Sequence, residues 1–426
     1  MLCTSTRAWI TGSILVLIEE PRAESRLGNM QSEARIKGAD GIRAVACLLV
    51  IFHHLAQRLN PDAPGLPLWV QKVHYCAMRG EVGVSIFFVL SGCLLSMPFW
   101  RSLIQGGAAP SLRLYIRNRA SRILPGYYLL LCISAPVGQW LIHQGIGWSR
   151  LAASFLFLNN FDYRTFFPSE VDTPLWSIGL EVWCYVLLPF VMLGILRCLH
   201  TVKGAALALL GVIVGLQLLN PIVISMLMTD GKDKGWQYGL IGGAKVWFPY
   251  WNLDSFFTQF LIGSCASLFI CWRYSKAGLP SVVGDVVGFV ALLAAFGLVL
   301  IRLNPGAPDD FTHQPYLTPL FPALIALALA GISQGKIIWL LLDNALFRYI
   351  ARISFGLYVW HWLLISIVEL KWMPNFVYFG MNSLSRWTTI SASILFVSIL
   401  IASLSWFVLE RPILQKYRKA DYVATK

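Results

Sequence analysis

Long apolar stretches recur along the whole chain, and they restrict the fold more than any other feature of the sequence. A helix needs about 20 mainly apolar residues to cross the hydrocarbon core of a bilayer. Ten stretches meet this length, near residues 41–59, 81–100, 124–143, 176–196, 204–226, 254–272, 281–301, 316–335, 353–370 and 388–409. The sequence therefore predicts an all-α integral membrane protein with about ten transmembrane helices.

Basic residues are concentrated in the connections that follow the even-numbered stretches. These connections contain Arg101, Arg113, Arg117, Arg119, Arg122, Arg197, Lys203, Arg273, Lys276, Lys336, Arg348, Arg352, Arg411, Lys416, Arg418 and Lys419. Cytoplasmic loops carry an excess of Lys and Arg, so we predict a cell (inner) membrane protein with both termini in the cytoplasm (N-in/C-in). The connection 227–250, on the opposite side, contains three lysines and runs against this pattern.

The overall composition supports the membrane class and argues against two others. Hydrophobic residues make up 57% of the chain and charged residues 13%, and the formal net charge is +13. Because the basic residues lie between apolar stretches, we expect them to set topology and to meet membrane lipids or phosphate, and we expect no nucleic acid partner. The nine cysteines are scattered without a C-x-x-C pair, so neither a disulfide framework nor a metal site is expected.

The chain divides into three unequal parts. Residues 1–37 form an N-terminal extension, predicted to be disordered or to follow a mis-assigned start, since the apolar segment 9–18 is too short to span and Met30 is an alternative start. Residues 38–413 form the multi-pass domain. Residues 414–426 form a basic cytoplasmic tail.

The first stretch, "GIRAVACLLVIFHH", carries an arginine at one end and two histidines at the other. Eleven residues separate Arg43 from His54, which is three helical turns, so both side chains share one face about 16 Å apart, whereas His53 points about 100° away. One interpretation is an arginine that snorkels to the interface and a histidine hydrogen bonded within the bundle. The other is a functional pair, because ionisable groups inside a membrane are candidates by default.

An arginine cluster follows the second stretch. In "SLRLYIRNRASRILPGYY", four arginines would line partly overlapping faces of a helix at the cytoplasmic boundary: Arg113, Arg117, Arg119 and Arg122. The cluster either sets topology and contacts lipid headgroups or clamps a cytoplasmic ligand with several phosphates, for which the planar guanidinium is suited.

Two further ionisable side chains lie inside predicted spans. Glu181 follows Trp176 and Ser177 in "TPLWSIGLEVW". A carboxylate at that depth needs a partner, and the histidines are candidates. His361 lies between two tryptophans in "ISFGLYVWHWLLI", at about the depth of His54, and is interpreted as a packing or substrate-lining group.

These motifs together resemble acyltransferase family 3, the bacterial membrane proteins that transfer acyl groups from acyl-CoA to surface polysaccharides and related acceptors. The motif residues are Arg43 and His54 (Arg-x10-His), Arg119 and Arg122 (R-x-x-R), and Trp176, Ser177 and Glu181 (W-S-x-x-x-E). Further segments similar to the family are "GVSIFFVLSGCLL", "NLDSFFTQFLIGSCAS" and "FVLERPI", so the resemblance covers residues from about 38 to 413.

The resemblance implies an acyltransferase of the EC 2.3.1 type, with acyl-CoA, most simply acetyl-CoA, as co-substrate and no metal. The acceptor would be a hydroxyl of a carbohydrate or lipid-linked saccharide. The oligomeric state stays open. A thiolate leaves readily, whereas an alcohol needs its proton removed as it attacks, so one base is the main requirement.

We assign the candidate site residues their roles as hypotheses on this basis. His54 is the general base or, alternatively, a covalent acyl carrier. The other assignments are Arg43 (guiding the pantetheine or polarising the thioester carbonyl), Glu181 (orienting His54), Arg117, Arg119 and Arg122 (binding the CoA phosphates), and Ser177, Trp176 and His361 (lining the substrate site).

Two readings from other functional classes compete with the acyltransferase. In a proton-coupled transporter of an anionic solute or acyl donor, Arg43, His54 and Glu181 would form a proton relay. The lack of a visible internal repeat and the arginine cluster argue against it. An inactive binding protein with the same fold is disfavoured by the intact set of motif residues.

Overall fold

The computed structural model describes residues 36–142, 147–276, 280–301 and 315–424. Within these residues the regular elements are helices, apart from an isolated bridge between Leu59 and Met381. The predicted N-terminal extension lies almost entirely outside the described residues, as does the end of the predicted basic tail.

Ten helical segments in the described part of the chain are long and apolar enough to cross a membrane, which confirms the predicted number. Their main helices are α2 (Ala39–Ala56), α4 (Gly83–Gln105), α5 (Leu112–Ile142), α7 (Trp176–Cys198), α8 (Val202–Leu227), α10 (Leu253–Ser275), α11 (Val282–Ile301), α12 (Leu320–Ser333), α14 (Ala345–Ile367) and α15 (Leu384–Ser405). An even number of spans places the start of α2 and the end of α15 on the same side of the membrane. That this side is cytoplasmic remains a prediction from the positive-inside rule.

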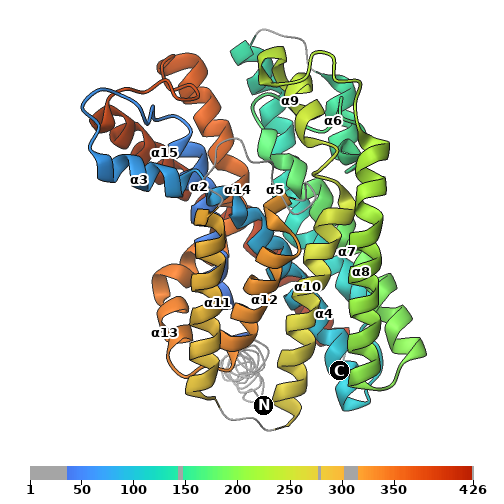
Figure 1. Ribbon diagram of the computed structural model, residues 1–426. Helices are drawn as coiled ribbons and strands as arrows, with labels where there is room; N and C mark the ends of the chain where they lie inside the picture. The colour runs from blue at the N-terminus through green and yellow to red at the C-terminus, as the bar shows by residue number, and fades with distance from the viewer. Residues whose placement is uncertain (1–35, 143–146, 277–279, 302–314, 425–426) are drawn as a thin grey trace, which may run out of the picture.

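Shorter helices lie at the ends of the bundle (Figure 1). They are α3 (Leu68–Ala77), α6 (Trp148–Phe155), α9 (Gly239–Trp247), α13 (Ile338–Leu342) and α16 (Arg411–Ala424). Helices α3, α6 and α9 lie at one end, and α13 lies at the other. The ninth and tenth spans continue into short π-helical segments, Val368–Trp372 and Trp406–Glu410.

Helices α4 and α10 pack backbone against backbone in the centre of the bundle. A Cβ atom on Gly92 would lie 1.8 Å from the carbonyl oxygen of Phe260, and one on Gly263 would lie 1.9 Å from that of Val89. Any larger residue at either position would separate the helices, which is the usual reason for small residues at membrane helix interfaces.

Helix α14 joins the first span, α2, to the last span, α15. It packs against both α2 and α15 through a cluster of buried apolar side chains that includes Cys47, Ile51, Leu357 and Ala402. Its other neighbours include α5. This position sets the C-terminal spans beside Arg43 and His54, although hundreds of residues separate them in sequence.

Candidate active site

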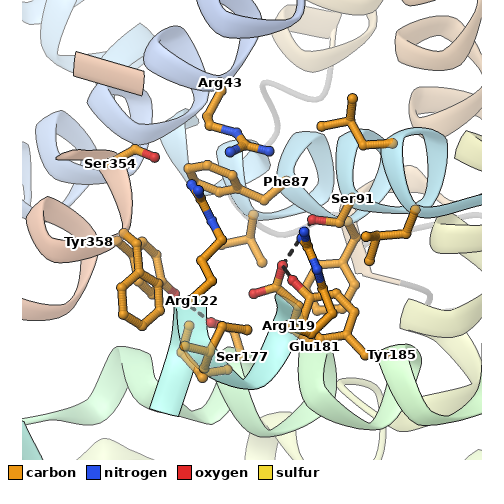
Figure 2. A pocket seen from close by; sticks show the side chains of 17 residues that line it. Arg43, Phe87, Ser91, Arg119, Arg122, Ser177, Glu181, Tyr185, Ser354 and Tyr358 are labelled. Atoms are coloured by element: carbon orange, nitrogen blue, oxygen red, sulfur yellow. Dashed lines mark hydrogen bonds between the residues drawn. The ribbon is translucent and has the colours of Figure 1, made fainter. Parts of the chain in front are cut away.

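A cavity lies where α2, α4, α5, α7 and α14 meet, with about 710 Å³ of empty space when its open mouth is included. Its polar lining residues are Arg43, Ser91, Arg119, Arg122, Ser177, Glu181, Tyr185, Ser354 and Tyr358. Figure 2 shows the guanidinium groups of the three arginines pointing into one shared space. The remaining wall is apolar and includes Phe87 and Phe88. Five of the sequence-predicted site residues are thus brought together here.

The cavity carries an excess of positive charge. Its lining holds three guanidinium groups and one carboxylate, that of Glu181, which gives 3 − 1 = +2 when all four are ionised. Apolar walls around like charges strengthen the attraction of a counter-ion. A ligand group with two negative charges is therefore the best electrostatic match.

Glu181 is held by hydroxyl groups. It accepts hydrogen bonds from Ser91 Oγ at 2.9 Å and from the hydroxyl of Tyr185, one helical turn further along α7. Its predicted role was to orient His54. The structure instead turns this carboxylate toward α4 and the cavity, and pairs His54 with a different residue.

That partner is His361. The Nδ1 atom of His54 lies 2.8 Å from Nε2 of His361, and Nδ1 of His361 lies 2.6 Å from the carbonyl oxygen of Tyr358. A carbonyl only accepts, so Nδ1 of His361 carries a proton and its Nε2 accepts one from His54 when the ring is neutral. This assignment leaves Nε2 of neutral His54 with a free lone pair, which is the requirement for a base.

Three further side chains lie on one side of the histidine pair, and they are connected by contacts from His54 to Trp362, Arg58 and Glu369. The edge of Trp362 meets His54 with ring centroids 4.7 Å apart, and the guanidinium of Arg58 lies 5.4 Å from the centre of the same tryptophan. Arg58 also forms an ion pair of 3.0 Å with Glu369. Burial lowers the pKa of Arg58, and the neighbouring Glu369 opposes this effect.

Tyr358 separates the cavity from the histidines. Its hydroxyl lines the cavity, lies 2.6 Å from Ser177 Oγ and donates to the carbonyl of Pro174 at 3.0 Å. Its own carbonyl holds His361. The predicted cavity-lining role of Ser177 thus agrees with its position.

Besides the histidine pair, two other predicted site residues lie outside the cavity lining. Arg117 stacks on Tyr417 at 5.7 Å, because it projects from a different face of α5 than Arg119 and Arg122. Trp176 is buried and stacks on Trp251, with ring centroids 4.2 Å apart, so its observed contacts are those of core packing.

Several residues at the site went unrecognised in the sequence. Tyr185 and Arg58 each lie four residues after a recognised one, Glu181 and His54, and this spacing was an available signal. For Tyr358 and Glu369 we find no comparable signal. Among the described residues, no group of three or more His, Cys, Asp or Glu side chains could hold a metal ion.

The fold and site define a multi-pass membrane protein with an anion-attracting cavity and a histidine pair in its interior. A family model described as an acyltransferase domain matches residues 36–403. The chain therefore belongs to acyltransferase family 3, a family of membrane-bound acyltransferases, as its motifs predicted.

Relatives compared one by one share about a quarter of their aligned residues with this chain. The chain is 24% identical to the peptidoglycan O-acetyltransferase OatA of Listeria monocytogenes over 350 residues, 79% of this chain and 50% of that protein. It is 26% identical to the putative peptidoglycan O-acetyltransferase YrhL of Bacillus subtilis, over 90% of this chain and 55% of that protein. It is 24% identical to the O-acetyltransferase OatA of Staphylococcus aureus, over 93% and 60%. The chain thus spans between half and three fifths of the length of these relatives.

Proposed function

We propose that this protein transfers an acyl group, most simply acetyl, from acyl-CoA to a hydroxyl of a carbohydrate or lipid-linked saccharide. Family membership supports the reaction class. The names of the relatives, peptidoglycan O-acetyltransferases, support an acetyl donor and a glycan acceptor.

The observation that carries the proposal is the hydrogen-bond chain that ends at His54. The acceptor hydroxyl attacks the thioester carbonyl, its proton passes to Nε2 of His54, a C–O bond forms and the C–S bond breaks to release CoA as thiolate. His361 takes the place that we first gave to Glu181. It accepts from Nδ1 of His54, so it keeps the ring oriented and stabilises the positive charge that His54 acquires.

The donor occupies the arginine cavity in this proposal. Arg119 and Arg122 bind the diphosphate, with Arg43 as a third cation, which matches the net charge of the lining. The pantetheine arm then extends past Tyr358 toward His54, about 16 Å along α2. That separation favours guidance of the donor by Arg43 over polarisation of the carbonyl, and we no longer assign phosphate binding to Arg117.

The decisive experiment measures thiol release from acetyl-CoA by purified protein in nanodiscs, with and without a polysaccharide extract. We expect release that depends on the extract and that falls by about 10²- to 10⁴-fold in His54→Ala. Binding of CoA should be unchanged in this variant, because its side chain is not part of the cavity lining. Full transfer by His54→Ala would refute the assignment, and a stoichiometric burst of thiol without acceptor would make His54 a covalent carrier instead.

A further inference from the structure

Arg58 and Glu369 form a charge-balanced pair next to the proposed base. Arg58 follows His54 by four residues, and only 6% of its surface is exposed. Glu369 lies on the π-helical segment that continues α14, and its side chain is 23% exposed. Because π-helical turns within helices occur frequently at functional sites, the position of Glu369 in such a segment is consistent with a functional role.

Two N–H groups in this cluster lack a hydrogen-bond partner. Nε of Arg58 and Nε1 of Trp362 are both buried, and neither has an acceptor among the described residues. A buried donor that is left unsatisfied destabilises the folded state. Buried polar groups are almost always satisfied in folded proteins, so an oxygen-bearing ligand is a direct explanation for two open donors beside His54.

The chemistry of the cluster differs from that of an anion site. The positive charge of Arg58 is already balanced by Glu369 at 3.0 Å. A hydroxyl group both donates and accepts, so it can donate to a carboxylate and accept from a guanidinium or an indole N–H. An uncharged molecule with several hydroxyl groups could hydrogen bond to Arg58, Glu369 and Trp362 at the same time.

We propose that Arg58, Glu369 and Trp362 form the binding site for the acceptor, an uncharged saccharide, beside His54. This inference rests on the proposed function for its link to catalysis, but not for binding itself. The site lies beyond His54 at the opposite end of α2 from the arginine cavity, so donor and acceptor reach the base from opposite directions. These three are binding residues, and the proton is still removed by His54.

The test measures saccharide binding directly, in nanodiscs, by saturation-transfer NMR with chitotetraose, cellotetraose and maltotetraose as probes. Trp362→Phe keeps an aromatic ring but removes the N–H together with the second ring of the indole, a loss of volume that the control below shares. We expect it to weaken binding of the tetrasaccharide that the wild type prefers by about tenfold, the loss of one hydrogen bond to a buried donor. Glu369→Gln serves as a second variant, with the same direction of change expected.

Trp360→Phe is the matched control. Trp360 lies on the same helix, and its buried Nε1 also lacks a partner. A separation of two residues places Trp360 roughly 200° around the helix from Trp362. We expect this variant to bind the saccharide like the wild type. Both tryptophan variants and Glu369→Gln should bind CoA normally, since none of the three residues lines the arginine cavity.

The outcomes separate this inference from the proposed function. The acceptor site is refuted if the wild type binds none of the three probes, or if Trp362→Phe binds them as tightly as Trp360→Phe does. Selective weakening in Trp362→Phe supports the site even if no thiol is released from acetyl-CoA. In that case the saccharide site stands and the transferase activity fails.

Discussion

At the Arg43 end of α2, the cavity lining carries three guanidinium groups against one carboxylate, whereas near His54 the guanidinium of Arg58 is paired with Glu369. The first environment attracts anions, and the second offers balanced donors and acceptors beside the paired imidazoles of His54 and His361. One helix therefore presents two chemically different sites about 16 Å apart. In the proposed function, this difference means that the Arg-x10-His spacing separates donor recognition from proton transfer while keeping both on one helix.

The largest effect that would sharpen this comparison is expected in the arginine cavity. The double variant Arg119→Gln/Arg122→Gln removes two of the charge-assisted hydrogen bonds that we propose to the CoA phosphates, each worth about 1.5–3 kcal/mol. We expect the Kd for acetyl-CoA, measured by calorimetry, to rise by about 100-fold or more. Binding of the tetrasaccharide probe should not change.

A donor without phosphates provides the control for this prediction. S-acetyl-pantetheine should be used equally well by the wild type and the double variant, because it has no charge for the arginines to bind. If the double variant loses activity with both donors, the arginines support the fold rather than the phosphates.

The next effect concerns His361, which we regard as a positioning residue. His361→Phe removes the acceptor for Nδ1 of His54, so the ring can flip or change tautomer. We expect kcat to fall by about 10- to 100-fold, with the KM for acetyl-CoA unchanged and the pH–rate profile shifted. His361→Gln restores an acceptor oxygen and should recover part of the rate. An unshifted pH profile in the Phe variant would indicate a purely structural role.

Much of this architecture was predictable from sequence because the bilayer imposes simple rules. Runs of about 20 apolar residues predicted ten spans, and ten are present. The 3.6-residue period predicts Arg43 and His54 on one face, and two arginines of the predicted cluster, Arg119 and Arg122, do line one cavity, while their binding of phosphate stays a prediction. All three inferences depend on residues that are close in sequence.

The partners of the ionisable groups were not predictable in the same way. His54 and His361 are 307 residues apart, and only the packing of α14 against α2 brings them together. The sequence showed that His54 and His361 lie at a similar depth. Charge alone, however, made Glu181 an equally good candidate partner for His54. The nearer partner of Glu181, Tyr185, is on its own helix, so local spacing was the better guide there.

A smaller effect distinguishes the two proposed partners of His54. Glu181→Gln keeps an oxygen that accepts from Ser91 and Tyr185 but raises the net charge of the cavity lining by one. We expect acetyl-CoA to bind a few-fold more tightly and kcat to change by less than about fivefold. If kcat instead falls as far as in His361→Phe, Glu181 acts on His54 after all and the separation of the two regions is wrong.

The smallest effect on activity is expected at Asp172, which precedes α7 and lies outside the spans. Its carboxyl group is buried, and desolvation raises its pKa to about 7 while the nearby Ser134 and Ser169 oppose the shift. Between an ordinary carboxyl pKa and pH 7 the folded state holds a proton that the unfolded state has released, so stability falls as pH rises through this range. We expect the free energy of unfolding to drop by roughly 2–3 kcal/mol between pH 5 and pH 8 from this group.

Asp172→Asn should remove that decline, because an amide is neutral at every pH. Thermal unfolding in detergent at several pH values measures the effect, with the wild type as reference. The pH–rate profile of the variant should stay that of the wild type, since the proposed base is His54 and not Asp172. The two measurements together separate pH dependence of the fold from pH dependence of the base. If the pH–rate profile of Asp172→Asn shifts together with its stability, the α7 end of the cavity and the histidine pair are coupled. In that case the two sites on α2 are not independent.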